Sequence, residues 1–156
     1  MPTEIERKFL VKDNSYQGLA RPILIRQGFL CNTAERVVRV RIMDKQAFLT
    51  IKGSSVGISR SEFEYPVPLD DARYMLARLC TSPLIEKLRY RISFGGFTWE
   101  VDEFLEENAG LVVAEIELER ENQAFTKPSW IGDEVTGDPR YYNSSLVRNP
   151  FRSWNS

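Results

Sequence analysis

Charged side chains recur at every second position in several parts of this sequence, and many of these neighbours carry the same sign. Glu4 and Glu6 form one such pair, and Arg39 and Arg41 form another. Side chains two residues apart on a β-strand point to the same face, so the members of each pair would lie side by side. Like charges at this spacing repel unless an opposite charge lies between them. The pairs therefore point to a ligand that carries charge of both signs.

A polyanion bound together with divalent cations would neutralise both sets of charges. Guanidinium and ammonium groups bind phosphate oxygens, and carboxylates bind hard cations such as Mg²⁺ or Mn²⁺. The sequence contains no histidine. This excludes Ser-His-Asp and Cys-His catalysis and histidine zinc sites. Any chemistry must come from carboxylates, amines, guanidinium groups and hydroxyls.

The elements that must position these charges are mostly extended. Alternation with period two predicts eight strands, over residues 3–11, 23–30, 36–43, 47–52, 59–67, 83–94, 97–105 and 111–119. Residues 70–79 change to a helical period with one apolar face. The tail from residue 123 is rich in proline and aromatic residues, with weak helical signals near Pro139 and Ser144. The predicted fold is α+β but mainly β, a closed eight-stranded antiparallel barrel with helices packed outside, since closure removes exposed sheet edges.

Two arrangements of this barrel fit the alternation. The ionic faces could lie outside in water around an ordinary apolar core. Alternatively, the barrel is inverted, with basic strands on one side of a polar lumen and acidic strands on the other. Solvated strand faces usually mix Thr, Ser, Gln and Lys, whereas these are almost purely charged and segregate by sign. The helix at 70–79 and the aromatic tail would then cover the apolar outer faces. The inverted barrel is the arrangement we expect.

Composition bounds the class of protein. The 156 residues suit a single domain, 1–156. A net charge of −1, from 21 basic and 22 acidic residues, gives no overall field for nucleic acid. Cys31 and Cys80 match no metal-ligand spacing, so we expect reduced thiols. The charged N-terminus is unlike a signal peptide, and no apolar run is long enough to span a membrane. A cytoplasmic location is expected.

The motifs resemble one family along almost the whole chain. EIERK at 4–8 resembles the ExExK signature of the CYTH, or triphosphate tunnel metalloenzyme, superfamily. It is followed in the family's order by VRVR at 38–41, LTIK at 49–52, RSEFE at 60–64, EKLRY at 86–90, EVD at 100–102 and EIE at 115–117. The closing WIG at 130–132 and EVTGDPRYYN at 134–143 resemble the tail of small bacterial members, which are inorganic triphosphatase-like.

The resemblance implies roles for the charged residues within an eight-stranded tunnel. Arg60, Arg91, Glu100 and Glu119 stay open between tunnel-mouth roles and structural ion pairs. The implied catalytic residues are Glu4, Glu6 and Lys8. The implied phosphate-binding residues are Lys8, Arg39, Arg41, Lys52, Lys87 and Arg89. The resemblance also implies an acidic set, of which a subset holds Mg²⁺ or Mn²⁺, and its members are Glu4, Glu6, Glu62, Glu64, Asp102, Glu115 and Glu117.

The resemblance also implies the reaction, which is hydrolysis of tripolyphosphate to pyrophosphate and phosphate. Phe29 stands where many members carry a tyrosine that pairs with the first-strand lysine, so the identity of the general base is open. Alternatives are adenylate cyclisation, with a base pocket built from Trp130, Tyr141 and Tyr142, or hydrolysis of thiamine triphosphate. A binder of polyphosphate or nucleotide without catalysis is a further alternative. The partner is a triphosphate-bearing small molecule, and a homodimer is possible.

Overall fold

The computed structural model describes residues 3–54, 56 and 59–154, and the side chains of Thr3 and Glu4 lie outside that description. The eight predicted strands all occur, and the tail adds a ninth. The strands are β1 (Thr3–Val11), β2 (Ile23–Asn32), β3 (Arg36–Met43), β4 (Gln46–Gly53), β5 (Ser59–Val67), β6 (Ile85–Phe94), β7 (Phe97–Phe104), β8 (Val112–Glu117) and β9 (Ile131–Glu134). The helices are α1 (Leu69–Arg78) and α2 (Asn143–Arg148), with 3-10 turns η1 (Ser15–Gly18), η2 (Glu106–Asn108), η3 (Pro139–Tyr141) and η4 (Phe151–Ser153).

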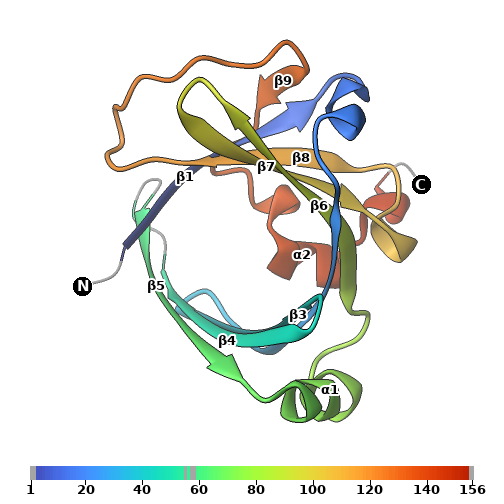
Figure 1. Ribbon diagram of the computed structural model, residues 1–156. Coiled ribbons are helices and arrows are strands. Elements are labelled where there is room, and N and C mark those ends of the chain that lie inside the picture. The colour runs from blue at the N-terminus through green and yellow to red at the C-terminus, as the bar shows by residue number, and fades with distance from the viewer. Residues whose placement is uncertain (1–2, 55, 57–58, 155–156) are drawn as a thin grey trace.

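The sheet closes on itself, as the sequence predicted. Its strand order is β5-β4-β3-β2-β6-β7-β8-β1, and β1 pairs back onto β5. All of these pairs are antiparallel. The first residues of β1, Thr3 to Ile5, pair with β5, whereas Phe9 and Val11 pair with β9. A single strand thus closes the barrel with one half and holds the tail with the other (Figure 1).

The ionic faces of the strands point into the barrel. Glu115 and Glu117 line the central cavity, whereas Ile116 between them is fully buried in an apolar cluster on the outer side of the sheet. Trp99 of β7 belongs to the same outer cluster. Lys87 is 1% exposed although it is charged. The inverted arrangement is therefore the one the chain adopts.

Two covers shield the apolar outer faces from water. Ala72 and Leu76 of α1 pack on Val40 and Ala47 of the β3–β4 wall. On the opposite wall, Trp130 lies 6.2 Å from Trp99 between ring centroids, and η1 adds Tyr16 to the same cluster. Burial of this kind contributes roughly 25 cal/mol per Å² of apolar surface. The outer covers thus supply the apolar core that a charged lumen lacks.

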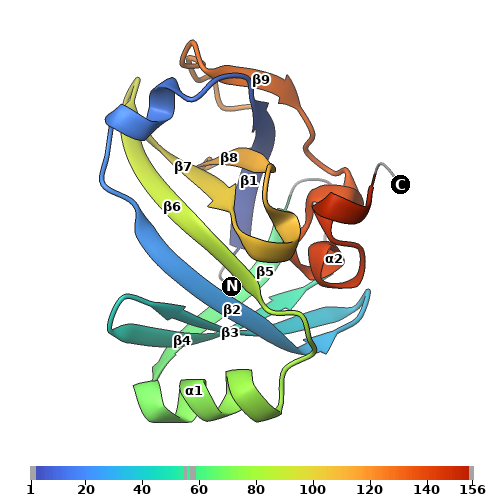
Figure 2. The same cartoon turned by 90° about the vertical axis from the view of Figure 1, so that its right-hand side faces the viewer.

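The second helix closes one end of the barrel instead of lying on its outer wall (Figures 1 and 2). Leu146 and Val147 of α2 are buried against Phe29 and Val37, which share the inward faces of their strands. The sequence explains this because each inward face turns apolar toward that end. Two residues along the same face, Leu10 comes after Lys8, Val113 before Glu115, Ile85 before Lys87 and Phe104 after Asp102. No helix in the described part of the chain is long and apolar enough to cross a membrane.

Candidate functional site

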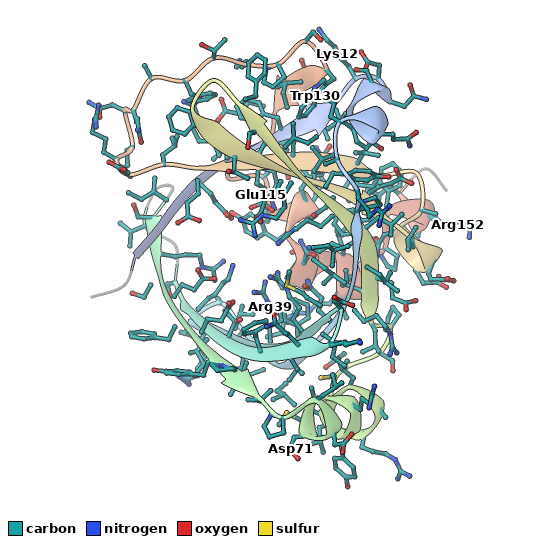
Figure 3. All side chains as sticks on the ribbon, in the orientation of Figure 1. Lys12, Arg39, Asp71, Glu115, Trp130 and Arg152 are labelled. Carbon is teal, nitrogen blue, oxygen red and sulfur yellow. The ribbon has the colours of Figure 1, made fainter. Side chains whose placement is uncertain are left out.

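The lumen contains a cavity of about 450 Å³. Figure 3 shows Arg39 and Glu115 entering it from opposite walls. The side chain of Glu4 lies outside the described part of the structure. The cavity is lined by Arg60, Arg91 and Glu100, which the sequence left open, and by the predicted residues Glu6, Lys8, Arg39, Arg41, Lys52, Glu62, Glu64, Lys87, Arg89, Glu115 and Glu117.

Asp102 shares the inward face but lies behind two of the basic residues. Its two carboxylate oxygens accept hydrogen bonds from Arg89 Nε at 2.7 Å and Nη2 at 2.9 Å. Lys87 Nζ lies 2.8 Å from Oδ2 of the same group. Burial alone would raise the pKa of Asp102, but the charges of Arg89 and Lys87 hold it well below its usual range. Both oxygens are thus used in holding the two cations.

Lys87 is a buried ammonium in a positively charged neighbourhood. Burial, together with Arg89 and Arg41, lowers its pKa from 10.5 to about 7, against the attraction of Asp102. Burial and the neighbouring Arg39 and Arg89 likewise lower the pKa of Arg41. The cations repel one another in this arrangement. A polyanion in the cavity would relieve this repulsion.

Replacing Lys87 by methionine is expected to change how stability depends on pH. The ammonium keeps its proton up to about pH 10.5 in the unfolded chain but loses it near pH 7 in the folded protein. Between these values the unfolded state binds more protons, so this group makes folding more favourable as pH rises. Relative to Lys87→Met, the wild type should gain up to about 1.4 kcal/mol per pH unit between about pH 7 and about pH 9. Urea unfolding of both proteins across this range measures it, and a constant difference would contradict it.

A chain of side-chain amides connects the barrel wall to α2. Arg41 Nε donates to Gln27 Oε1 at 3.0 Å, and Gln27 Nε2 donates to Asn143 Oδ1 at 2.9 Å. The same oxygen accepts from Lys87 Nζ at 2.9 Å. Neither amide was predicted from the sequence as part of the site. The signal for Gln27 is its position between Ile25 and Phe29 on an otherwise apolar inward face, which demands a polar partner inside the protein.

Lys8 is held by the segment that enters α2. Its Nζ donates to the backbone oxygen of Tyr141 at 3.2 Å and lies 5.5 Å from the ring centroid of Tyr142. An ammonium on an aromatic face is attracted by the ring quadrupole. Phe29, 2% exposed, packs in the apolar cluster under α2. Lys8 on β1 is therefore held in place by residues of the tail.

Further cations pair with carboxylates of β5. Arg39 Nη2 donates to Thr50 Oγ1 at 3.2 Å, and Thr50 Oγ1 donates to Glu64 Oε2 at 3.0 Å. Lys52 Nζ lies 3.4 Å from Glu62 Oε1. These pairs are more exposed than the pair at Asp102, since the Glu64 side chain is 43% exposed. Exposed pairs contribute little to stability, so these side chains are easily redirected toward a ligand.

The acidic side of the lumen is formed where β1 meets β8. Burial would raise the pKa of Glu115, but Lys8 and a hydrogen bond from Glu6 outweigh it and hold the value at about 2. Burial and the negative charges of Glu62 and Glu100 raise the pKa of Glu117. A divalent cation bound among these carboxylates would remove this repulsion. The donor set, carboxylates without sulfur or imidazole, fits Mg²⁺ or Mn²⁺.

The carboxylates do not form a complete metal site by themselves. Among the side chains that the structure describes, no three acidic groups already converge around one point. Mg²⁺ commonly takes only one or two protein carboxylates and completes its shell with water and substrate phosphates. The arrangement therefore fits a cation that arrives with a phosphate ligand.

Comparison with known proteins gives consistent matches. Residues 2–145 match the CYTH domain family. An inorganic triphosphatase of Acetivibrio thermocellus is 55% identical over 154 residues, which is 99% of each chain. An inorganic triphosphatase of Nitrosomonas europaea is 36% identical over 149 residues, covering 93% of this chain and 97% of the relative. A crystal structure of an inorganic triphosphatase superposes with a TM-score of 0.68 at 34% identity, over 94% of this chain and 95% of the other.

Proposed function

The chain belongs to the CYTH domain family, and we propose that it is a triphosphatase that hydrolyses tripolyphosphate to pyrophosphate and phosphate. The observation that carries this proposal is the division of one cavity into a basic and an acidic side. Inorganic triphosphatases similar over nearly the full length support it. The family resemblance and the donor set support dependence on a divalent metal, with Mg²⁺ or Mn²⁺ as the proposed ion.

In the proposed mechanism, the basic residues bind the phosphate oxygens and spread their charge as a bond to phosphorus breaks. Those residues are Lys8, Arg39, Arg41, Lys52, Lys87 and Arg89. A divalent cation would supply charge neutralisation and a more acidic water. The residues proposed to hold it are Glu4, Glu6, Glu115 and Glu117, with Glu62 and Glu64 nearby. For Asp102, the two cations on its oxygens favour a role in holding Arg89 and Lys87 over direct metal binding.

A substrate panel tests the proposal. Tripolyphosphate, ATP, thiamine triphosphate and pyrophosphate are each incubated with Mg²⁺ or Mn²⁺, and orthophosphate and cyclic AMP are measured. We expect the highest kcat/KM for tripolyphosphate and no turnover of any substrate without metal. Faster turnover of ATP or thiamine triphosphate would contradict the substrate assignment. Binding of tripolyphosphate by calorimetry without any turnover would support the binding module instead.

Adenylate cyclisation has less support from the residues at the cavity. It needs a pocket for the base, for which the sequence offered Trp130, Tyr141 and Tyr142. Trp130 is buried in the outer apolar cluster, and Tyr141 packs under α2. Of the three, Tyr142 lines the cavity.

The domain count, the cellular location, nucleic-acid binding and the oligomeric state stay predictions. We propose one domain over residues 1–156, a cytoplasmic location, no binding to nucleic acid and a possible homodimer. The near-neutral net charge of −1 supports the absence of nucleic-acid binding. Light scattering of the purified protein distinguishes monomer from dimer.

A further inference from the structure

The first residue of α2 joins a lumen cation and a buried amide through one oxygen atom. Asn143 Oδ1 accepts from Lys87 Nζ and from Gln27 Nε2, both at 2.9 Å. An amide oxygen has two lone pairs, so both are used. Gln27 is 0% exposed, so solvent water does not reach it to replace this hydrogen bond. Asn143 itself lines the cavity.

The second bond continues to another cation. Gln27 Oε1 accepts from Arg41 Nε at 3.0 Å. Asn143 thus supports Lys87 on β6 directly and Arg41 on β3 through Gln27. The two cations repel each other. Asp102 still holds Lys87 at 2.8 Å, but loss of Asn143 removes the link that fixes Lys87 relative to Gln27 and Arg41. A long basic side chain that becomes ordered only when the ligand binds loses conformational entropy, which weakens the affinity for the ligand. A side chain that is already held in place avoids this loss.

We propose that Asn143 is a positioning residue for the triphosphate, which orients Lys87 and Arg41 and makes α2 part of the binding site. This inference rests on the proposed function, since it takes the polyanion to bind at these cations. The hydrogen bonds that Asn143 Oδ1 accepts come from the basic side of the lumen, through Lys87 and Gln27. Loss of Asn143 is therefore expected to weaken phosphate binding more than the metal-dependent step.

The alternative is that Asn143 only anchors α2 to the barrel. Asn32 provides a matched control, because it binds α2 at Ser144, the residue next to Asn143. Asn32 Nδ2 donates to the backbone oxygen of Ser144 at 2.9 Å. This bond also anchors α2 to β2, but it touches neither Lys87 nor Arg41. Asn32→Leu and Asn143→Leu therefore remove comparable anchors, and only the second removes the support of the cations.

The test measures steady-state kinetics with tripolyphosphate and metal, and calorimetric binding of tripolyphosphate without metal. Asn143→Leu is expected to raise KM and the metal-free Kd at least about tenfold, with a much smaller change in kcat. Asn32→Leu should leave KM within about twofold. The double variant Gln27→Leu/Asn143→Leu should be no worse than the worse single variant, because the two act through one chain, whereas independent effects would multiply.

Several results would overturn the inference. One is an unchanged KM in Asn143→Leu, and another is an equal rise in KM in Asn32→Leu, which would assign the effect to anchoring. If the leucine variant does not fold, Asn143→Ala gives the same comparison without added bulk. A wild type that neither binds nor hydrolyses tripolyphosphate would contradict the proposed function itself. An active wild type with an unaffected Asn143 variant would contradict this inference alone.

Discussion

Replacing Glu6 and Glu115 together by glutamine is expected to lower metal-dependent tripolyphosphate hydrolysis by at least about 1000-fold. Glutamine keeps the shape of the side chain and removes the charge that holds a cation. The hydrogen-bonded pair at the junction of β1 and β8 is the best-defined acidic site among the described side chains. Phosphate release across a titration of Mg²⁺ and Mn²⁺ measures the effect.

The same variant should bind tripolyphosphate at least as well as the wild type when metal is absent. The lumen then carries less negative charge, so repulsion of phosphate falls. Glu86→Gln is a suitable control, because Glu86 accepts from Arg26 on the outer side of the barrel and should leave activity unchanged. Full activity of the double variant would exclude these carboxylates from the reaction. Loss of metal-free binding would instead indicate a disrupted lumen.

Replacing Asp102 by alanine is expected to destabilise the protein by about 3–5 kcal/mol. The change leaves Arg89 and Lys87 buried without the carboxylate that holds them. An unpaired buried charge costs far more than the intact pair contributes. Urea unfolding at neutral pH measures the loss. Asp102→Asn should cost less, because the amide oxygen still accepts one hydrogen bond.

Tripolyphosphate should partly restore the stability of the Asp102→Ala variant. A polyanion in the lumen supplies the negative charge that the variant lacks, and a ligand that binds the folded state alone raises the melting temperature. The rise should therefore exceed that of the wild type at the same degree of saturation. A melting temperature of Asp102→Ala within about a degree of the wild type would show that the buried cations need no counter-charge.

The barrel was predictable because the alternation of side chains between the two faces of a strand (here called parity) can be read from neighbouring residues of the sequence. Ile116 between Glu115 and Glu117 already assigns one face to apolar packing and the other to charge. β9 was not predictable in this way. It spans only Ile131–Glu134, shows no alternation, and exists because β5 leaves one edge of the second half of β1 open while β8 pairs with the other edge. Such a strand is determined by tertiary contacts, not by its own residues.

The charged lining was predicted for the same reason, but depth along the lumen was not. Parity correctly placed Asp102 on the inward face, yet its contacts with Arg89 and Lys87 set it behind the cavity wall. Gln27 and Asn143 were missed because an amide carries no charge to mark it. Their bond joins residues separated by 116 positions in the chain, and no spacing rule reaches so far.

The apolar seal that α2 forms across one end of the barrel has a kinetic consequence. The substrate and both fragments must use the same passage, past the end where Arg91 is 59% exposed. The fragment nearer that passage departs first, and the deeper one waits behind it. If hydrolysis is faster than release, we expect turnover at saturation to follow how quickly the inner fragment escapes the buried cations, and a short phosphate added in excess to compete by refilling that position.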